Sequence, residues 1–318
     1  MTNGVRVLVL AEHNQQELSP ATARLITAAQ SFGLPVDLLV AGSECKEVGE
    51  QARFYEGVSH ILLINEEQLH ARLAEDMTAC LLPLMRASHD ILLVASNAAG
   101  RELVPRLAAL LDVSPLSDAV QIVDAEQFVR PLHAGAVLTK VKLLTSKKLM
   151  TVRPSSFPPT SLRGNDTSLA ELVICDPVPL PSLSTQIGQE FLGNQQELED
   201  AAIIIGIGRG AQDEESLALI EKLAAHLEAM IGGSRVAVEL GMLANNEQIG
   251  QTGKTIAPKL YIALGISGAV QHLAGIRDAQ VIIAINKDPD APIFTVADYG
   301  LVGDLRNLLP DLLAALTS

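Results

Sequence analysis

The sequence contains no tryptophan, and aromatic residues make up only 3% of its 318 positions. Proteins that bind single-stranded nucleic acids stack the bases on aromatic side chains, so this composition argues against that class. Most of the apolar residues are aliphatic, and the apolar total of 48% stands against 19% charged residues. That balance is typical of a globular α/β protein with buried parallel strands rather than of a β-sandwich or a disordered chain.

Positive charge is scarce, and the formal net charge is -14 at pH 7. A strongly negative field disfavours contact with nucleic acid phosphates, so no nucleic acid partner is expected. The same field permits docking with basic surfaces of partner proteins. Solubility explains an acidic composition equally simply.

Cysteine is also sparse: Cys45, Cys80 and Cys175 lie far apart and form no CxxC pair. A structural zinc or an iron–sulfur cluster is therefore not expected, and scattered cysteines fit a reducing compartment better than a disulfide framework. The sequence shows no signal peptide, no Arg-rich presequence and no apolar span of about 18 residues. We expect a soluble cytoplasmic protein with no membrane insertion.

Aliphatic runs alternate with amphipathic stretches in the first half of the chain, which predicts a doubly wound parallel sheet. The expected strands are residues 5–10, 36–40, 60–64 and 90–95, and the expected helices are residues 20–33, 45–55, 69–87 and 102–111. Further β-like pieces should form antiparallel ribbons appended to this core, at residues 119–123, 127–129, 136–143 and 148–152.

Two polar stretches of the first half invite a functional interpretation. Glu12 and His13 follow the first expected strand, but one adjacent pair is weak evidence for acid–base chemistry, and we expect surface or interface polarity. Residues 96–101 form a strand-to-helix turn without a GxGxxG fingerprint. This turn fits a ligand site and an ordinary helix cap equally well.

Prolines concentrate between residues 153 and 183, which predicts a covering arm or linker. Residues 168–174 could still pair there as an edge strand. We place the domain boundary near residue 190. Residues 1–190 are then an N-terminal α/β domain with the ribbons and the proline-rich arm, and residues 191–318 form a second domain.

In the second half, polar residues follow one aliphatic run after another, where open α/β sheets bind ligands. The expected strands are residues 201–205, 260–264 and 281–285, and the expected helices are residues 213–231 and 305–316. The glycine pair at residues 232–233 should end the first of these helices. Gly253-Lys254-Thr255 is similar to a phosphate-binding P-loop, but that pattern needs a glycine at residue 248, where Gln248 stands.

Several motifs of the second half occur together in one fixed order. They are Gly208-Arg209-Gly210, Ser234-Arg235, residues 248–254, residues 258–261, residues 265–272, residues 284–288 and residues 291–304. This combination resembles the electron transfer flavoprotein α-subunit family. The resemblance is dense in the C-terminal half and looser in the first half.

The resemblance implies two mainly parallel, Rossmann-like domains, with FAD held by the C-terminal one and subunit contacts made by the N-terminal one. It implies a heterodimer with an electron transfer flavoprotein β subunit, which could itself carry AMP or a second FAD. Electrons would pass from flavoprotein dehydrogenases, such as the acyl-CoA dehydrogenases of fatty acid β-oxidation, to a membrane quinone oxidoreductase. Such a protein is an electron carrier without an organic substrate of its own.

The resemblance also implies roles for individual residues. Arg235 would lie against the isoalloxazine ring, Thr252 near its N5 and His272 near its O2 as a hydrogen-bond donor. The other predicted residues would contact the ring, the ribityl chain, the diphosphate and the adenosine. The complete predicted FAD set is Arg209, Ser234, Arg235, Ile249, Gly250, Gln251, Thr252, Ser267, Gly268, Ala269, Val270, Gln271, His272, Asn286 and Asp304. No metal ligand and no catalytic residue is predicted.

Three alternatives stay open at this point. The chain could be an FAD- or NAD-dependent oxidoreductase, a subunit of an electron-bifurcating flavoprotein, or a nucleotide-binding partner protein without redox chemistry. A catalytic acid–base pair near the flavin would favour an oxidoreductase, and the densely matched region contains none.

Overall fold

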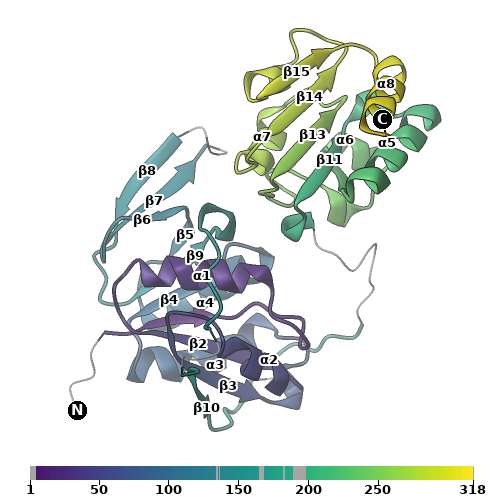
Figure 1. Cartoon of the computed structure of the whole chain (residues 1–318). Helices are drawn as coiled ribbons and strands as arrows, with labels where there is room; N and C mark the ends of the chain where they lie inside the picture. Colours follow the sequence, from purple (N-terminus) through teal and green to yellow (C-terminus); the bar gives the residue numbers. More distant parts are fainter. Residues whose placement is uncertain are drawn as a thin grey trace. The chain divides into compact units, whose positions relative to one another are not determined.

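The computed structural model describes residues 5–133, 135, 137–164, 168–181, 183–188 and 198–317 (Figure 1). The chain divides into two compact units, Met1–Gln189 and Glu190–Ser318. The predicted domain boundary near residue 190 falls among residues 189–197, which lie outside the described residues. Within the described ranges, no helix is both long enough and apolar enough to cross a membrane.

The first unit is built on a seven-stranded parallel sheet with the order β10-β3-β2-β1-β4-β9-β5. Its strands are β1 (Val7–Leu10), β2 (Val36–Gly42), β3 (Val58–Asn65), β4 (Ile91–Ala95), β5 (Leu116–Ala119), β9 (Lys148–Val152) and β10 (Glu171–Ile174). Its helices are α1 (Pro20–Gln30), α2 (Lys46–Ala52), α3 (Ala74–Ala87) and α4 (Ala98–Leu111), with 3-10 turns at Glu67–Leu69 and Pro154–Ser156.

Side-chain caps mark the starts of two helices of this unit. The Ser19 side chain accepts a hydrogen bond from the Ala21 amide at the start of α1. The Asn97 side chain likewise accepts one from the Gly100 amide at the start of α4. The turn at residues 96–101 is therefore a helix cap in this structure.

The ribbon prediction is correct in one part and wrong in another. Strands β6 (Gln121–Ile122), β7 (Gln127–Leu132) and β8 (Val137–Lys142) form a separate antiparallel sheet, as expected. Strand β9 instead pairs in parallel with β4 and β5 inside the main sheet. Leu149 packs into the core on one face of the sheet and Met150 into the core on the other, so β9 is covered on both sides. The expected edge strand is confirmed, because β10 pairs with β3 at the sheet edge.

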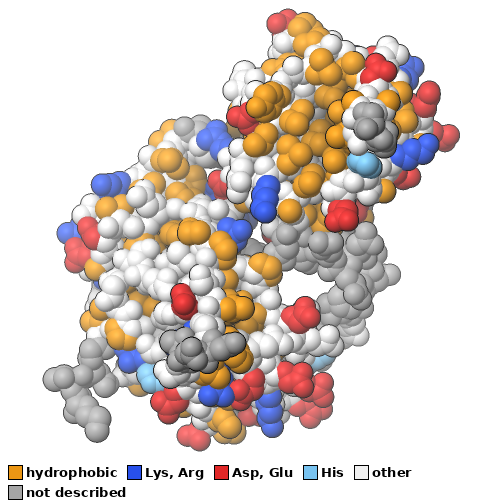
Figure 2. All heavy atoms as spheres, viewed as in Figure 1, with side chains coloured by type: hydrophobic (Ala, Val, Ile, Leu, Met, Phe, Trp, Pro, Cys, Tyr) orange, Lys and Arg blue, Asp and Glu red, His pale blue; other side chains and the backbone are white. Residues whose placement is uncertain are grey.

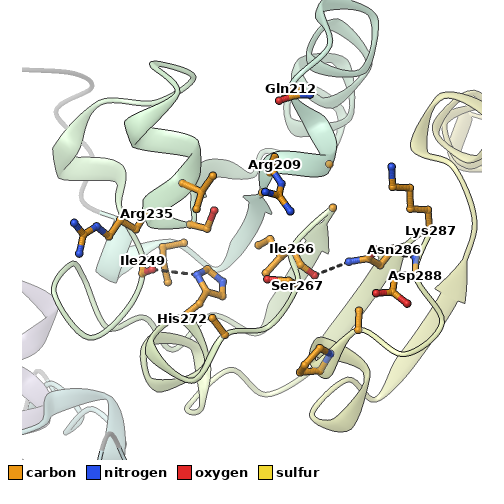
Figure 3. A pocket seen from close by; sticks show the side chains of 18 of the residues that line it. Arg209, Gln212, Arg235, Ile249, Ile266, Ser267, His272, Asn286, Lys287 and Asp288 are labelled. Atoms are coloured by element: carbon orange, nitrogen blue, oxygen red, sulfur yellow. Dashed lines mark hydrogen bonds between the residues drawn. The ribbon is translucent and has the colours of Figure 1, made fainter.

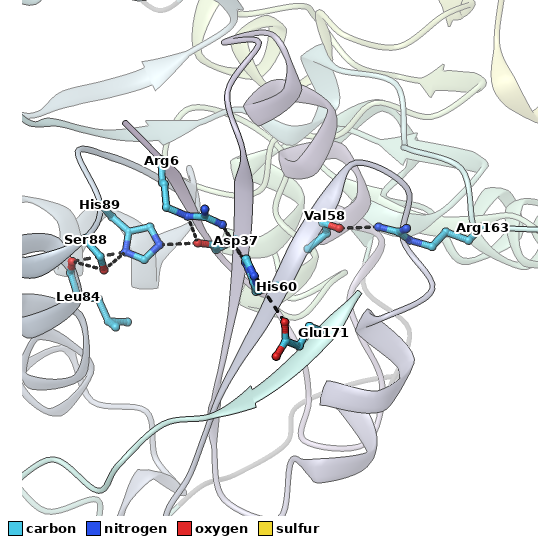
Figure 4. A network of polar contacts seen from close by, with 9 residues as sticks. All are labelled: Arg6, Asp37, Val58, His60, Leu84, Ser88, His89, Arg163 and Glu171. Carbon is cyan, nitrogen blue, oxygen red and sulfur yellow. Dashed lines mark hydrogen bonds and ion pairs between the residues drawn. The ribbon is translucent and has the colours of Figure 1, made fainter. Parts of the chain in front are cut away.

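A buried carboxylate ties the strand starts of this unit together (Figure 4). Asp37 of β2 is only 3% exposed. It accepts hydrogen bonds from Nε of Arg6 at 2.7 Å and from Nε2 of His89 at 2.9 Å, and Nδ1 of His60 lies 2.8 Å away. Burial alone would raise the pKa of Asp37, but the bonds from His89, Arg6 and His60 hold that pKa well below its usual range.

The second unit contains a five-stranded parallel sheet with the order β12-β11-β13-β14-β15. The chain adds β12 on one side of β11 and then crosses to place β13 on the other side, so the carboxyl ends of β11 and β13 form a switch point. The strands are β11 (Ile203–Ile207), β12 (Met230–Gly233), β13 (Leu260–Leu264), β14 (Ile282–Asn286) and β15 (Tyr299–Val302). The helices are α5 (Glu214–Leu227), α6 (Arg235–Glu239), α7 (Val270–Ile276) and α8 (Leu305–Thr317), with 3-10 turns at Leu198–Asp200, Arg209–Ala211, Asn245–Glu247 and Pro292–Thr295.

Helix α5 and strands β12 and β15 differ from the prediction, and the short helix α6 was not predicted. Helix α5 ends at Leu227 because Glu228 adopts a left-handed conformation with φ of 51°, and the next residues form strand β12 rather than a further helical turn. Strand β15 was not predicted, and it closes the sheet beside β14. The overall prediction of two mainly parallel doubly wound sheets is confirmed.

The outer strand β15 leaves apolar surface open. All of its residues are exposed, with Tyr299 at 67% and Val302 at 54%. Figure 2 shows hydrophobic side chains gathered on one face of this unit. Parallel sheets are usually covered on both faces, whereas the side chains of this edge strand are exposed.

Candidate functional site

A cavity of about 880 Å³ lies at the carboxyl ends of β11, β13 and β14 (Figure 3). Its volume is in the range of ligand and cofactor sites, which is roughly 300–1,000 Å³. Loops that follow different strands supply its walls. This is the place where the switch point of the sheet puts a ligand site.

The cavity brings together most of the residues predicted from the sequence. Those that line it are Arg209, Ser234, Arg235, Ile249, Gly250, Gln251, Thr252, Ser267, Ala269, Gln271, His272, Asn286 and Asp304. Gly268 and Val270 belong to the same loop and helix start but are not among the lining residues. That these residues bind FAD stays a prediction.

The sequence reasoning missed other lining residues, among them Gln212, Val236, Ile266, Lys287, Asp288 and Arg306. Each stands within three residues of a predicted position in the same loop. Lys287 and Asp288, for example, follow Asn286 directly. The sequence therefore contained a signal for these residues, because whole loops at the strand ends form the wall rather than single motif positions.

Glycines let two of these loops meet backbone to backbone. A Cβ atom on Gly208 would lie 2.4 Å from the carbonyl oxygen of Gly265, and one on Gly210 would lie 2.8 Å from the Gly265 Cα. Gly265 itself has φ of 64°, a conformation that favours glycine. The floor of the cavity consequently consists of backbone with no side chain to fill it.

The loop after β13 is held by hydrogen bonds to the end of β14 and to the segment around Ile293. Gly268 has φ of 84°, and a Cβ atom there would lie 2.3 Å from the Ile293 nitrogen. The Ile293 amide donates to the Ser267 carbonyl at 3.0 Å. Asn286 Nδ2 donates to the Ile266 carbonyl at 2.8 Å. Gly268 thus shapes the loop, and Asn286 anchors it from the end of the neighbouring strand.

The segment at residues 248–254 forms another wall. Gln248 Nε2 donates to the Thr252 hydroxyl at 2.9 Å, and the Gln251 amide donates to the Gln271 carbonyl at 2.7 Å. Gly250 has φ of 144° and passes close to the same carbonyl. A Cβ atom at this position would lie only 2.9 Å from the Gln271 oxygen. These contacts fix the segment against α7.

His272 is buried in the cavity wall and is only 5% exposed. Its Nε2 lies 2.8 Å from the hydroxyl of Tyr261, and its Nδ1 lies 3.1 Å from the carbonyl oxygen of Ile249. Burial lowers the pKa of His272 to about 4. Both ring nitrogens therefore have protein partners in this structure, whereas the sequence prediction has His272 donating to a bound ring.

Four cations and three carboxylates line the cavity: Arg209, Arg235, Lys287, Arg306, Asp213, Asp288 and Asp304. Arg306 pairs with Asp304 at 2.9 Å, and its hydrogen bonds lower the pKa of Asp304 to about 2. Arg235 pairs with Glu239 at 2.8 Å, and Figure 3 shows its side chain turned away from the cavity. Across the residues that the structure describes, Arg209 and Lys287 form no ion pair. Lys287 still attracts Asp304 electrostatically, but neither cation is held in a short ion pair with a described residue, so both can meet an anionic ligand.

His13 does not fit the expectation of surface or interface polarity, because it is buried inside the first unit. His13 in the first unit is 9% exposed, and its Nε2 lies 3.1 Å from the Ala41 carbonyl oxygen at the end of β2. Burial, with a smaller effect of the cation of Arg72, lowers the pKa of His13 to about 4. The chain after β1 folds back through a bridge between His13 and Leu18, which buries the ring.

The described residues contain no group of histidine, cysteine or acidic side chains that could hold a metal ion. Asp213, in the acidic first turn of α5, accepts a hydrogen bond from the Ser216 amide at 2.9 Å. It therefore acts as a helix cap in this structure.

Comparison with known proteins gives matches over both units. Residues 197–277 match the model of the electron transfer flavoprotein FAD-binding domain, and residues 7–173 match that of the electron transfer flavoprotein domain. The chain is 42% identical to a probable mitochondrial electron transfer flavoprotein subunit alpha of Caenorhabditis elegans, over 97% of this chain and 93% of that protein. It is 39% identical to the electron transfer flavoprotein subunit alpha of Pseudomonas aeruginosa and 41% identical to that of Paracoccus denitrificans. Each of these two matches covers 96% of this chain and 98% of the relative.

Proposed function

This chain belongs to the electron transfer flavoprotein α-subunit family, and we propose that it carries electrons on an FAD bound in the cavity of its second unit. The family places the FAD-binding domain at residues 197–277, in this unit. One observation supports placing FAD in this cavity. Residues that the sequence resemblance assigns to FAD come from six separate segments of the chain, and residues of all six line a single cavity.

The residues present fit such a cofactor. A dinucleotide needs an anion site for its diphosphate and a close approach of backbone along its length. Arg209 and Lys287 supply cations without ion pairs within the described chain, and the contact between Gly208 and Gly265 supplies the backbone floor. Apolar wall residues for a flat ring are Val236, Ile249, Ile266, Ala291 and Pro292.

We assign roles to the chain's own groups on this basis. When bound, FAD supplies the group that takes up and releases electrons. Arg209 and Lys287 hold the diphosphate, and Ser267, Gln271 and Asn286 orient the ribityl and diphosphate portion. Arg235 reaches the ring by leaving its exposed ion pair with Glu239, which costs little at the surface. A cation beside the ring favours negative charge on it.

The chain works as one half of a heterodimer with an electron transfer flavoprotein β subunit in this proposal. The relatives that match over nearly their whole length are named as alpha subunits, which supports this. AMP or a second FAD would belong to the β chain. The relatives include mitochondrial and bacterial proteins, so a cytoplasmic location for this chain stays a prediction.

Electrons come from flavoprotein dehydrogenases such as acyl-CoA dehydrogenases and leave to a membrane quinone oxidoreductase in this proposal. The chain is then a carrier without an organic substrate of its own. The net charge of -14 suits docking against basic partner surfaces.

An anaerobic transfer experiment tests this function. The purified αβ complex is mixed with an acyl-CoA dehydrogenase and its acyl-CoA substrate, and the flavin absorbance is followed. The proposal predicts that the flavin absorbance bleaches only when the dehydrogenase is present. The absorbance should recover when a quinone oxidoreductase and quinone are added. Direct bleaching by NADH without any dehydrogenase would instead favour an oxidoreductase.

A further inference from the structure

We propose that Tyr261 is a positioning residue that fixes the ring orientation and the proton position of His272 in the wall of the cavity. The importance of this pair for FAD depends on the proposed function. The pair itself lies entirely within this chain, so it can be tested without reference to FAD.

The geometry of the pair leaves little freedom to either ring. Tyr261 is the second residue of β13 and is fully buried at 0% exposure, and His272 lies on α7 at 5%. The phenol oxygen lies 2.8 Å from Nε2 of His272, and the two ring planes are tilted by 40°. A buried hydroxyl without a partner is costly, so this contact holds both side chains in place.

The second nitrogen of the imidazole settles where the proton lies. Nδ1 of His272 is 3.1 Å from the carbonyl oxygen of Ile249, and a carbonyl only accepts hydrogen bonds. Nδ1 must therefore carry a proton. Burial lowers the pKa of His272 and raises that of Tyr261, so the imidazole is neutral and the phenol keeps its proton near pH 7. Nε2 is then an acceptor, and the Tyr261 hydroxyl donates to it.

The neighbouring strand makes room for this arrangement. A Cβ atom on Gly206 of β11 would lie 1.8 Å from the Tyr261 hydroxyl oxygen. Glycine at this position is consequently what lets the phenol extend to the imidazole. A side chain at residue 206 would displace the hydroxyl from His272.

The result is a chain of hydrogen bonds that links the buried strand β13 to two walls of the cavity. It runs from Tyr261 on β13 to His272 on α7 and on to Ile249 in the segment at residues 248–254, and Figure 3 shows its last link. Two consequences follow. His272 faces the cavity as a neutral ring without a free N–H group, and its bond to Ile249 adds to the backbone hydrogen bonds that hold the wall segment bearing Thr252.

Nitrogen-15 NMR of the histidine rings in the αβ complex tests the inference. The signal of His272 is assigned by its loss in His272→Gln. We expect the wild-type ring to show the proton on Nδ1 from pH 8 to pH 5. Tyr261→Phe removes only the hydroxyl, so Nε2 loses its hydrogen-bond donor: the Nε2 signal should shift and the ring should protonate at higher pH. Tyr299→Phe, which removes an exposed hydroxyl, is the matched control and should leave the His272 signal unchanged.

A proton on Nε2 in the wild type would overturn the inference, as would an unchanged His272 signal in Tyr261→Phe. The wild-type spectrum decides the question even if the Tyr261→Phe variant does not fold. In fluorescence titration, FAD should bind Tyr261→Phe about fivefold more weakly than Tyr299→Phe, the loss expected for one hydrogen bond. If wild-type protein does not bind FAD, the proposed function fails while the NMR result still tests the role of Tyr261.

Discussion

The backbones of Gly208 and Gly265 are in direct contact, and a Cβ atom on Gly208 would lie 2.4 Å from the Gly265 carbonyl oxygen. These residues follow β11 and β13, the two strands that flank the switch point of the second sheet. Their contact brings two loops together and leaves a floor of bare backbone. The cavity exists because neither position carries a side chain.

Gly208→Ala is therefore expected to push these loops apart. Overpacking of this kind costs about 1–3 kcal/mol of unfolding free energy, and FAD binding should weaken at least about tenfold because the floor is displaced. Denaturant unfolding and FAD titration measure both effects. Gly188→Ala is the control, since no atom lies within 4 Å of a Cβ atom at that position. Identical stability and FAD affinity in the two variants would contradict the role of Gly208.

Arg235→Ala is expected to lower the reduction potential of the bound FAD. The variant removes a cation that favours negative charge on the ring. A tenfold weaker preference for the reduced form corresponds to about 59 mV in a one-electron couple, and reductive titration against a reference dye measures it. Glu239→Ala keeps the cation but removes its ion-pair partner at 2.8 Å, so its potential should stay equal or rise. An unchanged potential in Arg235→Ala would remove Arg235 from the ring.

Asp37→Asn is expected to destabilise the first unit by about 2–4 kcal/mol, because it leaves Arg6 and two histidines without their shared carboxylate. Urea unfolding measures the change. Glu126→Gln breaks an exposed pair with Lys142 and should have no measurable effect. The pKa of Asp37 is lowered in the folded state, so its contribution is present above about pH 4 and is lost as the pH falls further. Equal stability of the two variants would show that the network does not hold the strands together.

Two buried histidines should make the protein sensitive to mild acid. Burial lowers the pKa of His13 in the first unit and of His272 in the second to about 4, below the value of about 6.5 in an unfolded chain. The unfolded state binds more protons between these values, so stability is complete above about pH 6.5 and falls as the pH approaches 4. Each histidine contributes a loss of about 3 kcal/mol over this interval.

His13→Gln should remove the fall in stability of the first unit between pH 7 and pH 4.5. Unfolding at these two pH values measures this slope of stability against pH. His226→Gln on the exposed surface of α5 is the control and should keep the slope. If His13→Gln retains the full slope, His13 is not the group that takes up the proton.

Much of the fold follows from the sequence because aliphatic runs of four to eight residues can hardly be anything but buried parallel strands in a chain with this alternation. Strand β12 was missed because Ile231 stands at helical spacing from Leu227, and only the left-handed turn at Glu228 separates helix from strand. Strand β15 was missed because Tyr299-Gly300-Leu301-Val302 is short and contains a glycine.

The positions of the site were more predictable than its side-chain contacts. Strand ends bind ligands wherever the topology brings them together, so the motif residues mark the cavity wall. The hydrogen bond between Tyr261 and His272 depends on the rotation of α7 over the sheet, and the pairing of Arg235 with Glu239 depends on a helix of only five residues. Neither spacing nor composition encodes such contacts, which arise when the whole unit packs.

The amount of FAD released per αβ heterodimer, in wild type and in Ser267→Trp, tests the central claim most directly. Ser267 is an exposed residue of the cavity wall, and an indole there would fill the space proposed for the cofactor. The account predicts equimolar FAD in the wild-type complex and less than about a tenth of that amount in Ser267→Trp. Wild-type complex without flavin, or Ser267→Trp with equimolar FAD, would contradict it.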